Sequence, residues 1–254
     1  MAESPRSISS SALGLLRGIA FLVLAVCALL QLFVFILPWS RPQNRQQTRA
    51  RWLHCWCRIA CWLIGLRVRT AGSQPRAGLL VSNHLTYLDI IAYSSLQPCI
   101  FVAKSEIARW PLFGWLTTAA GTIYVDRQRR TASASGVRRI RQALADNLLV
   151  VLFPEGTSSG GENVLPFKSA LLEAAADIDA PITAAAIQYC LAQGNVAAEI
   201  CYWGEMTLVP HLANLFTKRR IESRVRFQRC HDLPVDRKNL ARELHAQVSA
   251  LLRA

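Results

Sequence analysis

The most constraining feature of this 254-residue chain is an apolar segment near its N-terminus. Residues 18–37 carry no charge and a single amide, Gln31. Because about 20 apolar residues in a helix cross the hydrocarbon core of a bilayer, this segment predicts a membrane anchor. It runs into Pro38, Trp39 and Arg41 and has no small-residue cleavage site, which favours a retained helix over a signal peptide.

The residues after the apolar segment indicate its orientation and a second helix. Arg6 and Arg17 precede the segment, whereas more arginines follow it, namely Arg41, Arg45, Arg49, Arg51 and Arg58. The positive-inside rule therefore places the downstream chain in the cytosol. Over residues 45–65 arginines alternate with tryptophans, which predicts an amphipathic helix in the headgroup layer. A hairpin that dips into one leaflet is the alternative geometry.

Charge and cysteine content restrict the class of partner. The formal net charge of +13 favours an anionic partner, which could be nucleic acid, a membrane surface or an acidic carrier. No recognition helix, zinc-finger spacing or aromatic RNA-binding signature is present, so we expect no nucleic-acid partner. The eight cysteines lie mostly in apolar stretches without a C-x-x-C pair, which indicates free thiols in a reducing compartment and no metal site.

The pattern after Gly65 is that of an α/β domain, in which short apolar runs alternate with amphipathic ones. We therefore divide the chain into an N-terminal membrane-anchoring helical module, residues 1–65, and an α/β domain, residues 66–254. The predicted strands are 66–71, 78–82, 99–103, 121–125, 148–153, 181–188, 197–203 and 224–230. The predicted helices are 86–96, 105–119, 131–146, 168–177, 210–217 and 236–252.

Polar residues follow three of the predicted strands. At 79–89, LLVSNHLTYLD, a buried strand ends before His84, and Asp89 lies about one helical turn further on. This spacing lets a carboxylate hold one imidazole nitrogen and leave the other as a general base. The stretches 149–159, LVVLFPEGTSS, and 121–127, GTIYVDR, bring further polar groups to strand ends, where ligands of open sheets bind.

These motifs resemble those of the glycerolipid acyltransferase family, which includes 1-acylglycerol-3-phosphate O-acyltransferase. The matching residues are N-H-x4-D at 83–89, G-x-I-x-x-D-R at 121–127, F-P-E-G-T at 153–157 and a Pro-containing strand at 181–187. The resemblance implies an α/β acyltransferase domain with a mixed sheet flanked by helices. It implies that His84 is the base and Asp89 its orienting partner. The expected substrate-binding residues are Asn83, Lys104, Arg127, Glu155, Gly156, Thr157 and Lys168.

The implied reaction moves a fatty acyl group from acyl-CoA or acyl carrier protein to the hydroxyl of a lyso-lipid at a bilayer. A thioester is already activated, so we expect no cofactor and no metal. The resemblance places 1-acylglycerol-3-phosphate first as acceptor and phosphatidic acid as product. It also implies a bacterial inner membrane, with the catalytic domain on its cytosolic face.

One departure from the family pattern concerns the acceptor. The family motif usually continues F-P-E-G-T-R-S, whereas this chain has Ser158 in place of the arginine. An arginine is a strong, charge-assisted partner for phosphate. Relatives with Ser or Thr here and a following V-L-P-F-K segment resemble the branch that acylates other lyso-lipids, including lyso-ornithine lipid. Lys168 is a candidate replacement charge.

Three further alternatives come from the sequence. The G-x-S-x-G match at 156–160 could mark a lipid hydrolase with Ser158 as nucleophile and His211, His231 or His245 as base, although the flanking residues do not suit a nucleophile elbow. Arginines between 127 and 141 could attract an anionic acyl donor. For the basic stretch 218–229, anionic lipid headgroups are the favoured partner.

Overall fold

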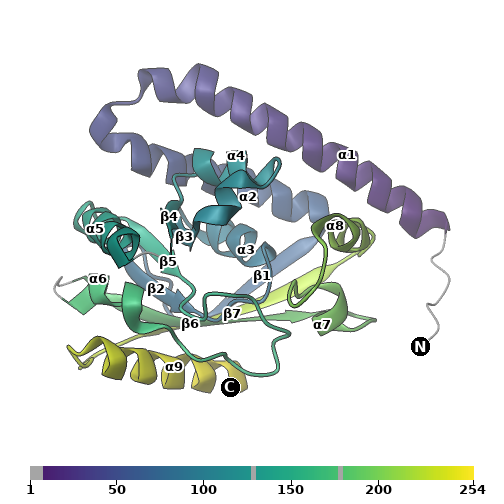
Figure 1. The fold of residues 1–254 in the computed structure, drawn as a ribbon. Helices are drawn as coiled ribbons and strands as arrows, with labels where there is room; N and C mark the ends of the chain where they lie inside the picture. Colours follow the sequence, from purple (N-terminus) through teal and green to yellow (C-terminus); the bar gives the residue numbers. More distant parts are fainter. Residues whose placement is uncertain (1–7, 127–129, 177–179) are drawn as a thin grey trace.

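The computed structural model describes residues 8–126, 130–176 and 180–254. They form a mixed seven-stranded sheet with helices on both faces, which confirms the predicted fold class (Figure 1). The strand order is β1-β7-β6-β2-β5-β3-β4. The strands are β1 (Leu66–Ala71), β2 (Gly78–Ser82), β3 (Ile100–Lys104), β4 (Ile123–Val125), β5 (Leu149–Leu152), β6 (Ile182–Cys190) and β7 (Ile221–Arg229).

Strand direction decides which loops can meet. β2, β3, β4, β5 and β6 run parallel, whereas β7 is antiparallel to β6 and parallel to β1. The five parallel strands therefore end at one edge of the sheet, which we call the carboxyl edge. β2 and β5 are neighbours, with Val81 opposite Leu152, so the turns that follow them lie side by side.

Each face of the sheet has its own hydrophobic core. Val150 packs with Ile140 and Leu244 on one face, and Val151 packs with Leu88 on the other. Because both faces are covered, the central strands are apolar throughout and do not alternate. The helices of the first face are α5 (Arg130–Ala145) and α9 (Arg237–Arg253), and those of the second are α2 (Arg45–Ile64), α3 (Leu88–Leu96) and α8 (Leu208–Phe216).

The N-terminal helix α1 (Ile8–Leu30) continues through a π-helical segment, Gln31–Ile36, into a 3₁₀ turn, Leu37–Trp39. Within the described chain, Ser11–Trp39 is long and apolar enough to cross a membrane. Figure 1 shows α1 lying across the molecule above α2, α4 (Phe113–Ala119) and α8. It does not project away from the domain.

Polar and aromatic contacts hold α1 in this position. The Arg17 guanidinium donates to the carbonyls of Phe216 (3.4 Å) and Lys218 (2.5 Å), where α8 ends. The ring of Phe21 packs against Phe216 with 5.6 Å between centroids. Further along, the Trp52 indole of α2 donates to the Ala28 carbonyl of α1 (3.1 Å). The N-terminal helices therefore pack on the α/β domain along the length of α1.

The predicted strand at 197–203 is wrong. Val196–Glu199 forms a helical turn, α7, because the Asn195 side chain accepts a hydrogen bond from the Ala198 N–H (3.2 Å) and caps it. The apolar residues after it are buried without joining the sheet, and the Tyr202 N–H donates to the Leu85 carbonyl (2.9 Å). The apolar run at 197–203 therefore reflects burial and not a strand.

Two predicted helices are divided in the structure. The helix at 105–119 becomes a 3₁₀ turn, Ser105–Arg109, and α4, because Pro111 interrupts the backbone hydrogen bonds between them. The helix at 168–177 becomes a 3₁₀ turn, Ser169–Leu171, and the short α6 (Glu173–Ala176). The other predicted elements agree with the structure to within about three residues.

Candidate active site

The turn after β2 brings His84 to the carboxyl edge. β2 is fully buried and ends at Ser82, and α3 begins at Leu88. The Asn83 side chain donates to the Ile187 carbonyl (3.0 Å) and accepts from the Ile187 N–H (2.8 Å), which ties the end of β2 to β6. The structure therefore gives the Asn83 amide a supporting position, and its expected contact with substrate stays a prediction.

Asp89 holds the His84 ring, as the spacing predicted. His84 Nδ1 lies 2.7 Å from Asp89 Oδ2. The Asp89 side chain is completely buried, whereas that of His84 is 22% exposed. The ring also stacks on Phe153, with 4.2 Å between centroids and 15° between planes. The hydrogen bond assigns the proton of the neutral ring to Nδ1, which leaves Nε2 as a proton acceptor.

Three further donors surround the Asp89 carboxylate. The N–H groups of Leu85 (2.7 Å) and Thr86 (3.1 Å) donate to Oδ2, and the Tyr189 hydroxyl (2.7 Å) donates to Oδ1. Burial and the adjacent Asp89 raise the pKa of Tyr189, so this hydroxyl keeps its proton. A buried carboxyl group needs such hydrogen-bond partners, because burying it without them is costly. Tyr189 lies 100 residues beyond Asp89 in the chain, and the sequence motifs did not identify it.

The turn after β5 places Glu155 beneath the His84 loop. The Gly156 N–H donates to the Phe153 carbonyl (3.1 Å), and Gly156 has a φ of +75°, which glycine adopts without strain. Glu155 is 2% exposed as a residue, and its carboxylate accepts the backbone N–H groups of His84 (2.9 Å) and Leu165 (3.1 Å). Glu155 therefore braces the loop that carries His84, and the acceptor contact expected for it stays a prediction.

Burial raises the pKa of Glu155 to about 7, and the two N–H bonds oppose this effect. The carboxyl group thus titrates near neutral pH while it supports the backbone of His84. The same loop is held a second time, because the Ser159 N–H donates to the His84 carbonyl (3.0 Å). The position of the His84 backbone is fixed from both sides.

The other predicted binding residues lie at or near the same edge. Lys104 is the last residue of β3, which neighbours β5, and its side chain is exposed. Thr157 and Lys168 are also exposed, and the Lys168 N–H donates to the Pro154 carbonyl (2.9 Å). Arg127 lies outside the described residues.

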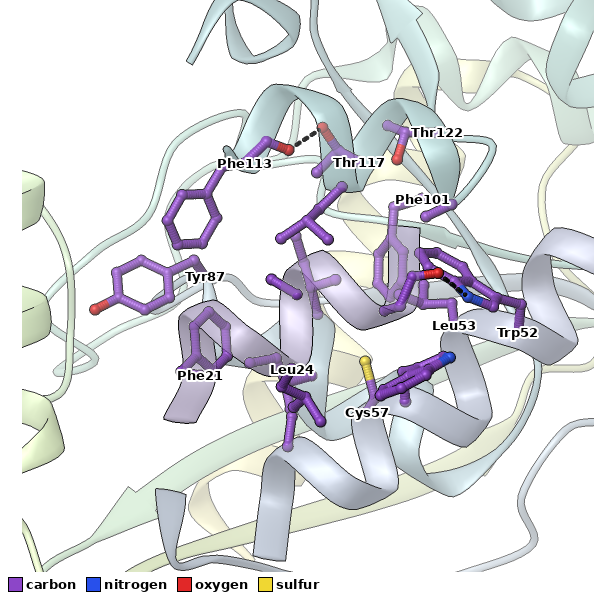
Figure 2. A pocket seen from close by; sticks show the side chains of 18 residues that line it. Phe21, Leu24, Trp52, Leu53, Cys57, Tyr87, Phe101, Phe113, Thr117 and Thr122 are labelled. Atoms are coloured by element: carbon purple, nitrogen blue, oxygen red, sulfur yellow. Dashed lines mark hydrogen bonds between the residues drawn. The ribbon is translucent and has the colours of Figure 1, made fainter. Parts of the chain in front are cut away.

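An apolar cavity of about 120 Å³ lies between α1, α2, α3 and α4 (Figure 2). Tyr87, which follows the His84 turn, forms part of its wall with Phe21, Phe101 and Phe113. Phe101 stacks on Phe153, the residue beneath the His84 ring. An apolar cavity therefore adjoins the polar edge, and no sequence motif indicated it.

The hydrolase alternative finds no support in the geometry. The Ser158 hydroxyl donates to the Tyr202 carbonyl. Both nitrogens of His211 are engaged, Nδ1 with the Tyr87 hydroxyl (2.8 Å) and Nε2 with the Cys201 carbonyl (3.0 Å). The Nε2 of His245 lies 3.1 Å from the Val164 carbonyl. Within residues 8–126, 130–176 and 180–254, no three His, Cys, Asp or Glu side chains are grouped to hold a metal ion.

The sequence of the chain is similar to those of known enzymes. A family model described as Acyltransferase matches residues 66–188. The lyso-ornithine lipid O-acyltransferase of Rhizobium meliloti (strain 1021) is 35% identical over 80% of this chain and 75% of the relative. The protein of the same name from Brucella abortus (strain 2308) is 34% identical over 92% of this chain and 94% of the relative.

Enzymes with a phosphate-bearing acceptor in their name are also similar. The 1-acyl-sn-glycerol-3-phosphate acyltransferase of Neisseria meningitidis serogroup B is 34% identical over 66% of both chains. The crystal structure of the 1-acyl-sn-glycerophosphate acyltransferase PlsC from Thermotoga maritima aligns with a TM-score of 0.61 and 18% identity, covering 93% of this chain and 96% of that one. This structural likeness shows a shared fold.

Proposed function

Because the chain belongs to the glycerolipid acyltransferase family and transfers acyl groups to a lyso-lipid, we propose that its acceptor is lyso-ornithine lipid. The observation that carries this choice is the match to the Brucella abortus enzyme, which extends over nearly the whole of both chains. The match to the Neisseria meningitidis enzyme covers two thirds of them. This order reverses the ranking expected from the sequence motifs.

The residue at position 158 supports the same acceptor. Where the family motif usually carries an arginine, Ser158 donates to the Tyr202 carbonyl and brings no positive charge. A phosphomonoester carries up to two negative charges, whereas an ornithine headgroup combines an ammonium with a carboxylate and needs fewer cations. The second candidate remains 1-acylglycerol-3-phosphate, which the exposed Lys104 and Lys168 near the carboxyl edge favour.

The proposed chemistry uses His84 as general base. Nε2 takes the proton of the acceptor hydroxyl as its oxygen attacks the carbonyl carbon of the thioester. The C–S bond then breaks, and the imidazolium returns the proton to the departing sulfur, so that the thiol leaves and His84 is neutral again. Asp89 fixes the Nδ1 proton and stabilises the imidazolium that forms. The acyl chain occupies the cavity beside Tyr87, which brings its thioester to the His84 turn. No covalent enzyme intermediate is needed, since the thioester is already activated.

Acyl transfer by the purified protein tests the acceptor. Lyso-ornithine lipid and 1-acylglycerol-3-phosphate are offered separately with the same acyl donor, and the products are identified by mass spectrometry, with His84→Ala as the inactive control. We expect ornithine lipid to form with at least a tenfold higher kcat/KM. Preferential formation of phosphatidic acid, or rescue of a host that lacks its own lysophosphatidic acid acyltransferase, contradicts this acceptor.

We also propose that α1 lies along the cytosolic leaflet of a bacterial inner membrane. Its inner side contacts α8 and α2, while its outer side exposes apolar residues such as Leu16, Leu22 and Val23. Trp62 of α2 and Trp115 of α4 are 81% and 70% exposed and belong to the same group of helices (Figure 1). This surface suits insertion into one leaflet.

Reporter fusions distinguish this arrangement from a spanning helix. If α1 lies in the plane of the leaflet, reporters before Met1 and after Ala254 are both cytosolic. A spanning helix places the first of them outside. A periplasmic C-terminal reporter contradicts both geometries.

A further inference from the structure

One face of the sheet at β1 and β7 is rich in arginine. Arg67 and Arg69 on β1 and Arg224 and Arg226 on β7 share this face, which we call the arginine face, because Arg69 pairs directly with Arg224 across the two strands. The alternate residues point the other way and belong to the core beneath α2 and α8; they are Leu66, Val68, Val225 and Phe227. The alternation follows from the two-residue period of a strand.

The arginine face has an unbalanced charge. Glu222 is the one acidic residue on β1 and β7. Its carboxylate lies 3.9 Å from the Arg69 guanidinium and also pairs with Arg220. Like charges directly opposite each other destabilise a sheet, so the Arg69–Arg224 pair does not serve folding. Arginines on β1 can protect an exposed edge strand from pairing, but β7 is an interior strand and needs no such protection.

The arginine face points away from the proposed membrane side. Its strands present their apolar residues to α2 and α8, the helices on which α1 rests. On the arginine side, α9 packs on β6 and reaches only part of β7. The Arg69 side chain is 67% exposed, and Arg224 is exposed as well. Anionic headgroups, the partner expected for 218–229 from the sequence, therefore do not suit Arg224 or Arg226.

The arginine face reaches the same carboxyl edge as the candidate active site but from the opposite face of the sheet, since Tyr189, which binds Asp89, belongs to the core beneath α2 and α8. β7 is separated from β2 by β6 alone, which places it about 10 Å to the side at the usual strand spacing. Along the strands, Arg224 pairs with Gln188, next to the Ile187 that Asn83 binds. Arg224 is thus level with the turn that carries His84.

We infer that the arginine face docks an acidic carrier protein that presents the acyl thioester on a phosphopantetheine arm. The inference rests on the proposed function, since it concerns the donor of that reaction. An acidic protein surface complements the exposed guanidinium groups of Arg67, Arg69 and Arg224, which can pair with carboxylates in a bidentate manner, whereas the half-buried Arg226 donates to Gln188 (2.7 Å). The docked protein stays outside, and its extended arm passes around the carboxyl edge to bring the thioester to His84.

A charge-reversal variant tests the inference. We compare wild type with Arg69→Glu/Arg224→Glu, and with Lys238→Glu/Arg242→Glu in the N-terminal half of α9 as a control of equal charge change at exposed positions. Kinetics are measured with acyl carrier protein thioester and with acyl-CoA of the same chain. In the first variant we expect KM for the carrier thioester to rise about tenfold or more, and KM for acyl-CoA to change less than about twofold. We expect the α9 control to resemble wild type.

Several results would overturn the inference. They are an equal loss with both donors, a selective loss in the α9 control, and a wild-type enzyme that uses acyl-CoA alone. Reduced binding of the first variant to anionic phospholipid vesicles would assign the face to headgroups instead. If the thermal midpoint of Arg69→Glu/Arg224→Glu falls below that of wild type, Arg69→Gln/Arg224→Gln is used in its place. The proposed function fails separately, if wild type acylates no lyso-lipid from either donor.

Discussion

Glu155→Gln tests whether burial or hydrogen bonding governs the pKa of the Glu155 carboxyl group, which binds the backbone of His84. In the native protein burial raises the pKa of Glu155 from 4.5 to about 7, although two backbone N–H groups favour its ionised form. Glu155 thus keeps its proton up to about pH 7 when folded and loses it near 4.5 when unfolded. Unfolding therefore releases a proton between these pH values, and the stability falls as pH rises, by about 3 kcal/mol in total.

Glutamine keeps the shape of Glu155 but cannot titrate. Its oxygen accepts one of the two N–H groups and its NH₂ faces the other, which costs about 1–3 kcal/mol at pH 5. Between pH 5 and pH 8 the wild type loses stability at this site and the variant does not, so their difference in unfolding free energy should shrink by about 2.5 kcal/mol. Denaturant unfolding in detergent at both pH values measures the difference. If the difference in unfolding free energy stays constant or widens, the N–H bonds and not burial govern the pKa of Glu155.

Three further variants test the supporting contacts. Tyr189→Phe removes one donor from the buried Asp89 carboxylate and should lower the unfolding free energy by about 1.5–3 kcal/mol, with a loss of kcat larger than any change in KM; an unchanged kcat in a folded variant refutes the positioning role. Ser158→Ala should keep most of the turnover, because the hydroxyl binds the Tyr202 carbonyl and no base, whereas a hydrolase would lose nearly all activity. Arg17→Leu should lower the thermal midpoint while membrane retention persists, and loss of retention with an unchanged midpoint contradicts the docked α1.

The contact between His84 and Asp89 could be predicted because both residues belong to one local segment. A strand that ends before His84 and a helix that begins soon after it fix the separation of the two side chains to about one turn. The positions of the central strands could also be predicted, since burial on both faces leaves continuous apolar runs. Such features depend on neighbouring residues alone.

Contacts between distant segments could not be predicted in this way. Tyr189 reaches Asp89 only because β6 lies beside β2, and strand order is not written in any local pattern. Glu155 was correctly placed at a strand end, but the adjacent β2–β5 pairing directs its carboxylate to the His84 backbone. The arginine face likewise required the register of β1 against β7.

The N-terminal helix illustrates a further limit of sequence patterns. Its length and hydropathy identify a membrane-associated segment but do not distinguish a spanning helix from one that lies on the domain. The distinguishing residue is Arg17, whose carbonyl partners lie about 200 positions further along the chain.

The central claim, that His84 is the general base, is tested most directly by the kcat of His84→Ala. The exposed His231→Ala serves as the matched control, and an unchanged thermal midpoint shows that both variants are folded. We expect kcat to fall by at least about 10²- to 10⁴-fold in His84→Ala, with little change in KM for the acyl donor, and to stay near wild type in His231→Ala. A folded His84→Ala that keeps more than about a tenth of the wild-type turnover contradicts the mechanism.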